Sequence, residues 1–324
     1  MNPDLLPHPS QKHINHTHPT AMDAPPGRFW RSAAYFSAYG VSRLVPRVVG
    51  NGIADAAALT AHALKLRERA GVRNNLSAVL RQSPASSRVK NAARHVYLNF
   101  GRACAALLYE TRDRKAGDAA LPNLRFEGLD ILDRAIAENN GVILASAHLG
   151  GWELGALALA SRGYPLTALA SPPAAGAAAL YERHRERFGL KTLSASTSAF
   201  RCISVLRQGG VLGVVADRRF GSAGLTANFF GRQTKLPQGP ARLCARTGAP
   251  ILAASLRFMQ GDTKHPLLTI HGRIDAPAAS DRTDSVLAIQ QQLAELLESM
   301  IAESPEEWYC FEDMWPFHDK VGSS

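Results

Sequence analysis

The chain has 324 residues, so it can bury one large hydrophobic core or two small ones, and its 46% hydrophobic and 20% charged residues are ordinary for a globular protein. The formal net charge of +10 is concentrated near the N-terminus, because residues 27–115 hold 16 Lys and Arg but 4 Asp and Glu. This basic segment indicates an anionic partner, such as nucleic acid, a membrane surface or an acidic carrier protein. The four cysteines, which form no C-x-x-C pair, are expected to be free and mostly buried thiols: Cys104, Cys202, Cys244 and Cys310.

The N-terminus is polar and lacks the apolar stretch of a secretory signal. The longest uncharged run, residues 163–181, contains three prolines, so we do not expect it to form a membrane-spanning helix. Residues 1–26 and 319–324 are expected to be disordered tails. Any membrane contact is therefore expected to be peripheral.

Residues 27–118 are expected to form a basic helical section. Aromatic and arginine residues between Phe29 and Arg47 fit either a helix at a membrane interface or an ordinary surface helix, and both readings stay open. Ile53–Arg69 and Val89–Thr111 are predicted helices, the second with apolar residues at helical spacing.

Strands and helices alternate after Asp118, in a section that we expect to span residues 119–318. The predicted strands are 124–127, 141–147, 166–170, 211–216, 251–258 and 267–272; the predicted helices are 129–138, 154–160, 174–188, 200–208, 240–247 and 283–303. This alternation predicts an α/β fold with a mainly parallel central sheet flanked by helices.

The segment His148-Leu-Gly-Gly-Trp-Glu153 joins one of these strands to the next helix. On one continuous helix, five positions would put His148 and Glu153 on different faces. With His148 at the strand end and Glu153 in the first helical turn, and with Gly150 and Gly151 allowing a tight turn, the two side chains can converge. We expect a general-base site in which the carboxylate holds the imidazole ring.

Two other segments are expected to contribute to this site, because functional groups of parallel sheets collect beyond the carboxyl ends of the strands. Asp217-Arg218-Arg219 follows the strand 211–216, and a polar helix over residues 181–189 carries Arg185 and Arg187. Either arginine can be the one that lines the site.

The sequence lacks several competing signatures. It has no G-x-S-x-G elbow, no Walker loop and no G-x-G-x-x-G motif after a strand. No second histidine stands at metalloprotease spacing from His148, and no nucleic-acid motif is recognised. We therefore expect no cofactor, no metal and no nucleic-acid partner, and a His/Glu pair that activates a substrate hydroxyl directly.

The motif His148-x4-Glu153 resembles the H-x4-D/E box of glycerolipid and lipid A acyltransferases. The order of the motifs after it is similar to that of the late acyltransferases of lipid A biosynthesis: the segments 211–217, 228–232 and 238–250, then Pro305-Glu-Glu-Trp-Tyr309 and Trp315, with Arg73-Asn-Asn-Leu76 near the N-terminus. The resemblance covers about Arg28 to Trp315.

This resemblance implies an acyltransferase that moves a fatty acyl chain from an acyl-carrier-protein or acyl-CoA thioester to a hydroxyl of a lipid acceptor. It implies an enzyme on the cytoplasmic face of a bacterial inner membrane, in contact with an anionic membrane surface. The family usually has an apolar anchoring helix at the N-terminus, but the corresponding segment here is weaker and interrupted by arginines, so we expect the attachment to be peripheral. His148 would be the general base and Glu153 its orienter, while N–H groups near Gly150 and Gly151, or an arginine, would stabilise the thioester oxyanion.

The chain departs from the family at Arg218, where the family usually has Gln after Asp, and in its acidic residues after Tyr309. These departures leave the acceptor open between lipid A and another glycolipid, phospholipid or aminolipid. Two further functions are compatible with the same motifs. One is a non-catalytic homologue that binds membrane or carrier protein, and the other is a thioesterase that uses water as the acceptor.

Overall fold

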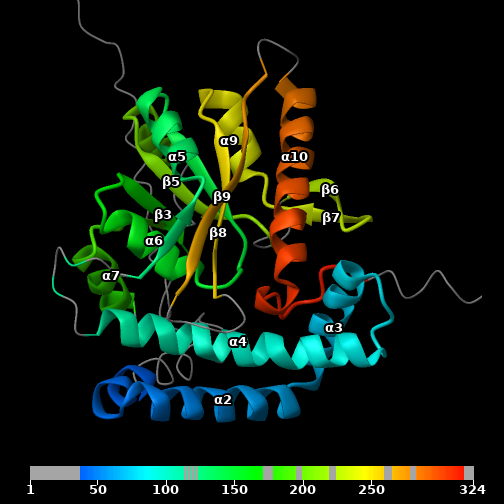
Figure 1. Cartoon of the computed structure of the whole chain (residues 1–324). Helices are drawn as coiled ribbons and strands as arrows, with labels where there is room; N and C mark the ends of the chain where they lie inside the picture. The colour runs from blue at the N-terminus through cyan, green and yellow to red at the C-terminus, as the bar shows by residue number, and fades with distance from the viewer. Residues whose placement is uncertain are drawn as a thin grey trace, which may run out of the picture.

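A seven-stranded sheet with the order β1-β9-β8-β2-β5-β3-β4 forms the centre of the molecule (Figure 1). The computed structural model describes residues 37–112, 115, 118, 121, 123–170, 178–194, 199–218, 224–258, 265–277 and 282–316. The strands are β1 (Arg125–Glu127), β2 (Val142–Ser146), β3 (Leu166–Ala170), β4 (Lys191–Ser194), β5 (Val211–Val215), β8 (Ile251–Arg257) and β9 (Leu267–Ile274). All neighbouring strands pair in parallel except β8 and β9, which confirms the predicted α/β fold with a mainly parallel sheet.

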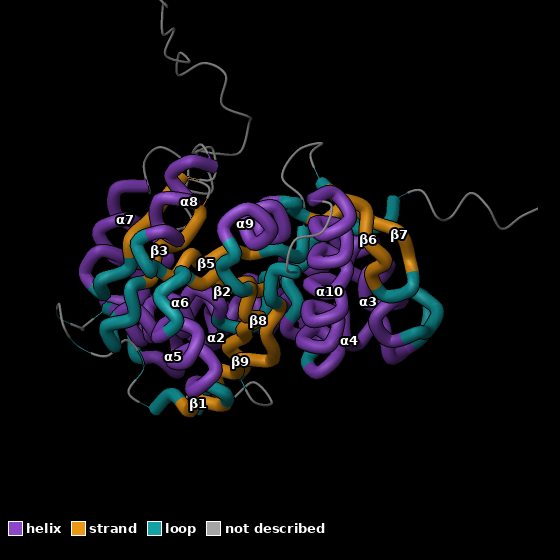
Figure 2. Tube along the Cα trace, turned by 90° about the horizontal axis from the view of Figure 1, so that it is seen from above, coloured by secondary structure: helices purple, strands orange, loops and turns teal. Residues whose placement is uncertain are grey.

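Helices cover both faces of this sheet, as the view from above shows (Figure 2). The helices are α2 (Arg47–Leu64), α3 (Leu66–Leu80), α4 (Ser87–Thr111), α5 (Leu129–Ala137), α6 (Trp152–Ala160), α7 (Ala178–Arg187), α8 (Ala199–Arg207), α9 (Gly239–Thr247) and α10 (Arg282–Glu303), with a short 3-10 helix at Pro305–Glu307. Helices α5 and α6 pack on one face and α8, α9 and α10 on the other. Because each strand has apolar side chains on both of its faces, helices must cover the sheet from both sides, which gives three layers: helices, sheet and helices.

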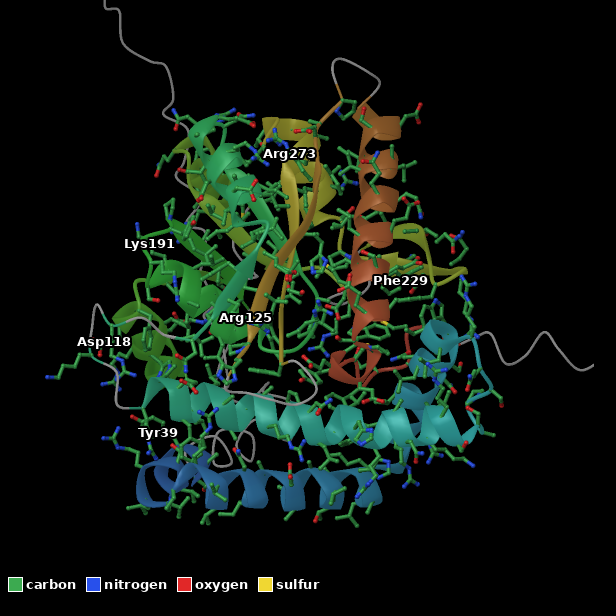
Figure 3. All side chains as sticks on the ribbon, in the orientation of Figure 1. Tyr39, Asp118, Arg125, Lys191, Phe229 and Arg273 are labelled. Carbon is green, nitrogen blue, oxygen red and sulfur yellow. The ribbon has the colours of Figure 1, made fainter. Side chains whose placement is uncertain are left out.

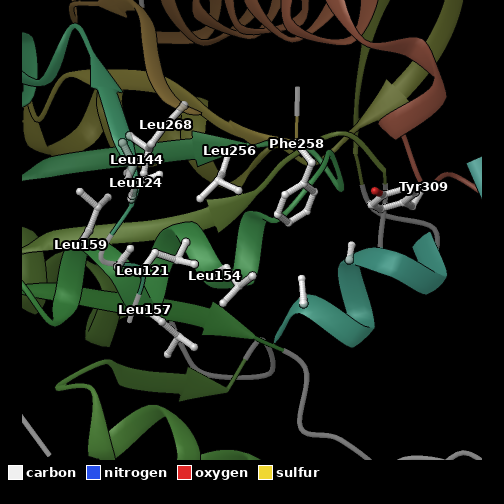
Figure 4. Packing of buried hydrophobic residues seen from close by; sticks show 14 of the residues in the cluster. Leu121, Leu124, Leu144, Leu154, Leu157, Leu159, Leu256, Phe258, Leu268 and Tyr309 are labelled. Atoms are coloured by element: carbon white, nitrogen blue, oxygen red, sulfur yellow. The ribbon is translucent and has the colours of Figure 1, made fainter. Parts of the chain in front are cut away.

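The strand β2 shows why the sheet must be covered on both sides. Val142 and Leu144 belong to the core beneath α5 and α6, whereas Ile143 and Ala145 belong to the core beneath α8, α9 and α10. Successive side chains of a strand point to opposite faces, so this continuous apolar run fills two cores. Figure 4 shows the first core, where Leu144 packs with side chains of α6 and β8.

The helices α2, α3 and α4 form an N-terminal layer beside the carboxyl ends of the parallel strands. In Figure 1, α4 lies across this end of the sheet and α2 lies on the far side of α4. Figure 3 places Tyr39, which precedes α2 in the chain, beside this layer, and Arg273, near the end of strand β9, at the opposite end of the molecule. The helix layer and the functional end of the sheet are therefore neighbours.

Several elements differ from the predictions. The predicted single helix Ile53–Arg69 is divided at Lys65 between α2 and α3, and α3 continues to Leu80, although its charged sequence carries little apolar periodicity. Strand β4 is a four-residue strand at the sheet edge, and β6 (Leu225–Phe229) and β7 (Arg232–Leu236) form an antiparallel hairpin with alternating buried positions. Residues 29–36, the expected tails and Arg219 lie outside the described residues. Among the helices that the structure describes, none combines the length and the apolar character needed to cross a membrane. The four cysteines are free, and all but Cys104 are buried.

Candidate active site

The register of β2 and β5 brings together His148 and Asp217, which stand 69 positions apart in the sequence. Ser146 pairs with Val215 at the last position of the two parallel strands, and each functional residue follows its strand end by two positions. The two side chains therefore emerge at the same edge of the sheet, as expected for the carboxyl ends of neighbouring parallel strands.

His148 and Asp217 form a close hydrogen-bonded pair, with 2.7 Å between Nδ1 of the imidazole and Oδ1 of the carboxylate. Asp217 is fully buried, and its Oδ2 accepts a second hydrogen bond, 2.8 Å long, from Nε1 of Trp308. Burial raises the pKa of the Asp217 carboxyl, but His148, the Trp308 hydrogen bond and Arg218 together hold that pKa below its ordinary value. The carboxylate is therefore charged, and it orients the ring and favours a proton on Nδ1.

Arg218 contacts the other ring nitrogen of His148, with 3.1 Å between its Nη2 and Nε2. Guanidinium groups can only donate, so Nε2 must be the accepting, unprotonated nitrogen. This assignment agrees with a proton on Nδ1 that is donated to Asp217. Nε2 is then the nitrogen that can take a proton from a substrate, and the positively charged guanidinium of Arg218 lies beside it.

Glu153 does not hold the ring of His148, contrary to the expectation from the sequence. Its carboxylate accepts two hydrogen bonds from Arg185, 2.7 Å from Nε to Oε1 and 2.8 Å from Nη2 to Oε2. Both side chains are largely buried, and Arg185 also donates to Thr192 at 3.2 Å. Glu153 does lie in the first turn of α6, as expected, but from there its carboxylate meets α7 rather than the imidazole.

The N–H groups of Gly150 and Gly151 are already used within the fold. Gly150 donates to the carbonyl of Glu307 at 2.9 Å, and Gly151 donates to the carbonyl of Leu256 at 2.8 Å. Gly150 has a φ of +56°, and a Cβ there would lie 2.0 Å from the Leu256 carbonyl oxygen. These glycines allow the tight turn that the sequence predicted. The structure does not support their expected role as oxyanion donors.

The two candidate arginines of α7 have different surroundings. Arg185 lines the cavity described below, whereas Arg187 donates to the carbonyl of Thr111 at the end of α4 and stacks on Phe188. Of the two, Arg185 is therefore the one at the site. It acts through Glu153, which it holds at the start of α6.

A cavity of about 420 Å³ opens beside these groups and extends between α6 and the sheet. Its polar side chains include those of His148, Glu153, Arg185 and Arg218. The rest of the lining is mainly apolar and includes Leu144, Leu159, Leu166, Leu256 and Leu268. A concave, mostly apolar cavity with a few convergent polar groups is typical of a small-molecule or lipid-chain site. Here the polar groups lie around the imidazole of His148.

Sequence reasoning gave Trp308 no role in the site, although it belongs to a motif that the resemblance singled out. An aromatic series also connects the site to the N-terminal layer: Trp152 lies 5.4 Å from His148 and 5.9 Å from Tyr309, and Tyr309 lies 5.2 Å from Phe100 of α4, between ring centroids. Because Trp308 and Asp217 stand 91 positions apart, the sequence gives no signal for their contact.

Among the described residues, no group of three or more His, Cys, Asp or Glu side chains could hold a metal ion.

Two comparisons with known proteins find that the chain is similar to acyltransferases. A family model described as bacterial lipid A biosynthesis acyltransferase matches residues 26–316. The chain is 31% identical over 195 residues to a protein of Mycobacterium tuberculosis (strain ATCC 25618 / H37Rv) named phosphatidylinositol mannoside acyltransferase, covering 58% of each chain. It is 27% identical over 201 residues to the protein of the same name from Mycolicibacterium smegmatis, covering 58% of this chain and 63% of that protein. The chain thus matches about three-fifths of the length of these curated relatives.

Proposed function

The chain belongs to the bacterial lipid A biosynthesis acyltransferase family, and from this premise we propose that it transfers a fatty acyl chain from a thioester to a hydroxyl of a membrane glycolipid. The observation that carries the proposal is the His148–Asp217 pair, whose outward nitrogen Nε2 lies at a mostly apolar cavity. The family description names lipid A and the relatives are named for a phosphatidylinositol mannoside. A sugar hydroxyl of a glycolipid is the acceptor class that both names support.

In the proposed reaction, Nε2 of His148 takes the proton of the acceptor hydroxyl as its oxygen attacks the thioester carbonyl. Asp217 stabilises the imidazolium that forms, without taking its proton. The tetrahedral intermediate collapses to the new ester, and the imidazolium returns the proton to the departing thiolate. The acyl chain lies in the apolar part of the cavity, where burial of its methylene groups stabilises the complex.

Arg218 is the proposed stabiliser of the oxyanion. Its guanidinium lies beside Nε2 and lines the cavity, so a small displacement places it next to an oxygen that reacts at that nitrogen. A positioned cation in a cavity with little water stabilises developing negative charge strongly. Arg218 must also leave Nε2 before a hydroxyl can bind there, which fits a residue that moves from the base to the substrate.

The test is incubation of the purified protein with acyl-carrier-protein or acyl-CoA thioesters and total membrane lipid, followed by mass spectrometry. We expect one glycolipid class to gain an acyl chain, and His148→Ala to abolish the gain. Asp217→Asn is expected to lower kcat about 10³–10⁴-fold, because the ring loses the partner that fixes its tautomer. Transfer by His148→Ala at the wild-type rate would refute the assignment of the base. Release of free fatty acid with no acylated lipid would indicate a thioesterase instead.

We further propose that the outer face of α2, with the residues just before it, contacts an anionic membrane surface. Leu44, Val48 and Leu64 are 75–85% exposed, and Val49 and Ile53 are about half exposed. The charged side chains of α2 point the other way, since Arg47 pairs with Glu110 and Asp55 pairs with Arg102 on α4. A helix with an apolar outer face, flanked by basic residues such as Arg43 and Lys65, is typical of interfacial binding. The same layer lies next to the functional end of the sheet (Figure 1), so a lipid acceptor would have a short path to His148.

Cosedimentation with vesicles of anionic phospholipid tests this surface. Val48→Asp combined with Ile53→Asp is expected to lower binding at least about tenfold, because two charges would enter the acyl region of the bilayer. The matched control is Phe200→Asp on α8, which removes another large exposed apolar side chain (73% exposed) far from α2 in the sequence. Equal loss in both variants, or no loss in the double variant, would contradict the proposal.

A further inference from the structure

Residues 304–315 run across the catalytic loop and contact both members of the His148–Asp217 pair. We call this segment the C-terminal strap. The indole Nε1 of Trp308 donates to Oδ2 of Asp217 at 2.8 Å, and the backbone N–H of Tyr309 donates to the carbonyl of His148 at 2.8 Å. The carbonyl of Glu307 accepts from Gly150 at 2.9 Å. The strap therefore fixes the backbone on which His148 stands as well as the carboxylate that orients its ring.

The contact between Trp308 and Asp217 excludes water. Trp308 is 2% exposed and Asp217 is fully buried. The indole is held by Phe229 and Phe230 of the β6–β7 hairpin, each with its ring centroid 6.1 Å away. With Oδ2 taken by a rigid donor, Oδ1 faces Nδ1 of His148. If the indole N–H were absent, no water could replace it without a change in the surrounding packing.

The strap is in turn anchored to the N-terminal layer. The side chain of Asn75, 1% exposed, donates to the carbonyls of Cys310 (3.0 Å) and Glu312 (2.7 Å) and accepts from the N–H of Met314 (3.0 Å). Asn74 donates to Asp313 at 2.9 Å. Asn74 and Asn75 belong to the Arg73-Asn-Asn-Leu76 segment, so the two motifs at opposite ends of the chain meet here.

We propose that Trp308 is a positioning residue of the active site, which holds Asp217 in the orientation that aligns His148, and that Asn75 holds the strap in place for this purpose. The inference rests on the proposed function for its kinetic consequence, but its structural content is independent of the reaction. Trp308 and Asn75 belong to two motifs for which the chemistry of the His148–Asp217 pair alone gives no role.

The experiment compares Trp308→Phe with Trp315→Phe. Trp315 is a matched control because it is also buried in the strap and packs near the same Phe229, at 6.2 Å between ring centroids. Its Nε1 has no hydrogen-bond partner among the described residues, so its replacement removes a similar aromatic volume without removing a bond. We expect Trp308→Phe to lower kcat about 10–100-fold with little change in KM, as is typical when an orienting partner is lost. Trp315→Phe should change kcat by less than about threefold.

The pH profile separates positioning from general destabilisation. Without the indole donor the Asp217 carboxylate is more basic, so protonation of its partner His148 becomes easier. The acidic limb of kcat/KM should then move to higher pH in Trp308→Phe and stay in place in Trp315→Phe. Equal losses of kcat in the two variants, or an unchanged acidic limb in Trp308→Phe, would overturn the proposal.

Proton NMR of the unreacted protein keeps this test separate from that of the acyl transfer. The Nδ1–H proton between His148 and Asp217 should give a resonance that is absent in His148→Ala. In Trp308→Phe this resonance should shift or broaden, because the carboxylate can rotate, and in Trp315→Phe it should remain. An unaltered resonance in Trp308→Phe would refute the positioning role of Trp308 even if the protein transferred acyl chains. An altered resonance would support that role even if the protein transferred none.

Discussion

Replacement of Glu153 by Ala tests whether this residue acts on the fold or on the base. In the structure Glu153 forms two hydrogen bonds with Arg185, 2.7 and 2.8 Å long, and the two side chains are 12% and 5% exposed. Loss of one partner from a buried, doubly hydrogen-bonded ion pair lowers the free energy of unfolding by about 3–5 kcal/mol, because the other charge stays buried without a partner. We expect a fall in the midpoint of thermal unfolding of roughly 5–15 °C for a domain of this size.

The double variant Glu153→Ala, Arg185→Ala should recover part of this loss. Removal of the stranded charge means that the two single losses do not add, and the coupling should be about 1–3 kcal/mol. The matched control is Asp130→Ala, which breaks the exposed pair with Arg134, where both side chains are at least 66% exposed. That change should cost less than about 1 kcal/mol.

The assays are thermal or urea unfolding followed by circular dichroism, and the pH profile of acyl transfer. We expect Glu153→Ala to lower stability and to leave the acidic limb of the profile in place. If Glu153→Ala unfolded at the same temperature as Asp130→Ala while the acidic limb moved, the assignment of Glu153 to the fold would be refuted. That result would mean that Glu153 holds the imidazole in solution.

Three further outcomes follow from single residues. Gly150→Ala should destabilise the fold by about 2–4 kcal/mol, because its φ is +56° and the new Cβ would meet a carbonyl oxygen of β8. The control Gly163→Ala, with φ of +89° and open space around it, should cost about 1–2 kcal/mol in the same unfolding assay. Burial raises the pKa of Glu307 to about 7, so the folded state binds more protons than the unfolded state between pH 4.5 and 7. Stability should therefore fall as pH rises through that window, by roughly 3 kcal/mol for this group, and Glu307→Gln should remove this part of the decline; a decline of the same size in the variant would contradict the assignment. Arg218→Gln should lower kcat about 10²–10³-fold, because oxyanion stabilisation is lost. It should also move the acidic limb of kcat/KM to higher pH, because the cation beside His148 is lost. An unchanged kcat would exclude the oxyanion role.

The strands of the central sheet were predictable because their apolar runs are bounded by turn residues. Leu166–Ala170 has the predicted bounds, and β2 and β5 differ from the prediction by one residue at their ends. The hairpin β6–β7 was missed because its turn, Phe230-Gly231, has positive φ at both positions, and Phe rarely adopts that conformation. Helix α3 was missed beyond Arg69 because its buried residues follow from packing against α4 and the strap rather than from a regular apolar stripe.

The sequence singled out His148, Glu153 and Asp217, which the structure places near one another, but it did not predict how they pair, and it gave Trp308 no role. Both Glu153 and Asp217 follow strands, and the sequence alone favoured Glu153, which is near His148 in the chain. The partner of His148 depends on the fact that β5 lies next to β2, and on a register in which Ser146 faces Val215. Neither is encoded in a local pattern, because strand order is set by how the intervening helices pack.

The strap has a consequence for the folding of the chain during its synthesis on the ribosome. Trp308 follows Asp217 by 91 positions, so at ordinary rates of synthesis, about 5–20 residues per second, some 5–20 s separate the two residues. When Asp217 is made, β2 and β5 have been synthesised, but Asp217 has no indole donor, and the cavity still lacks Leu256 of β8 and Leu268 of β9. The His148–Asp217 pair therefore acquires its full set of contacts only after residues 304–315 have been synthesised.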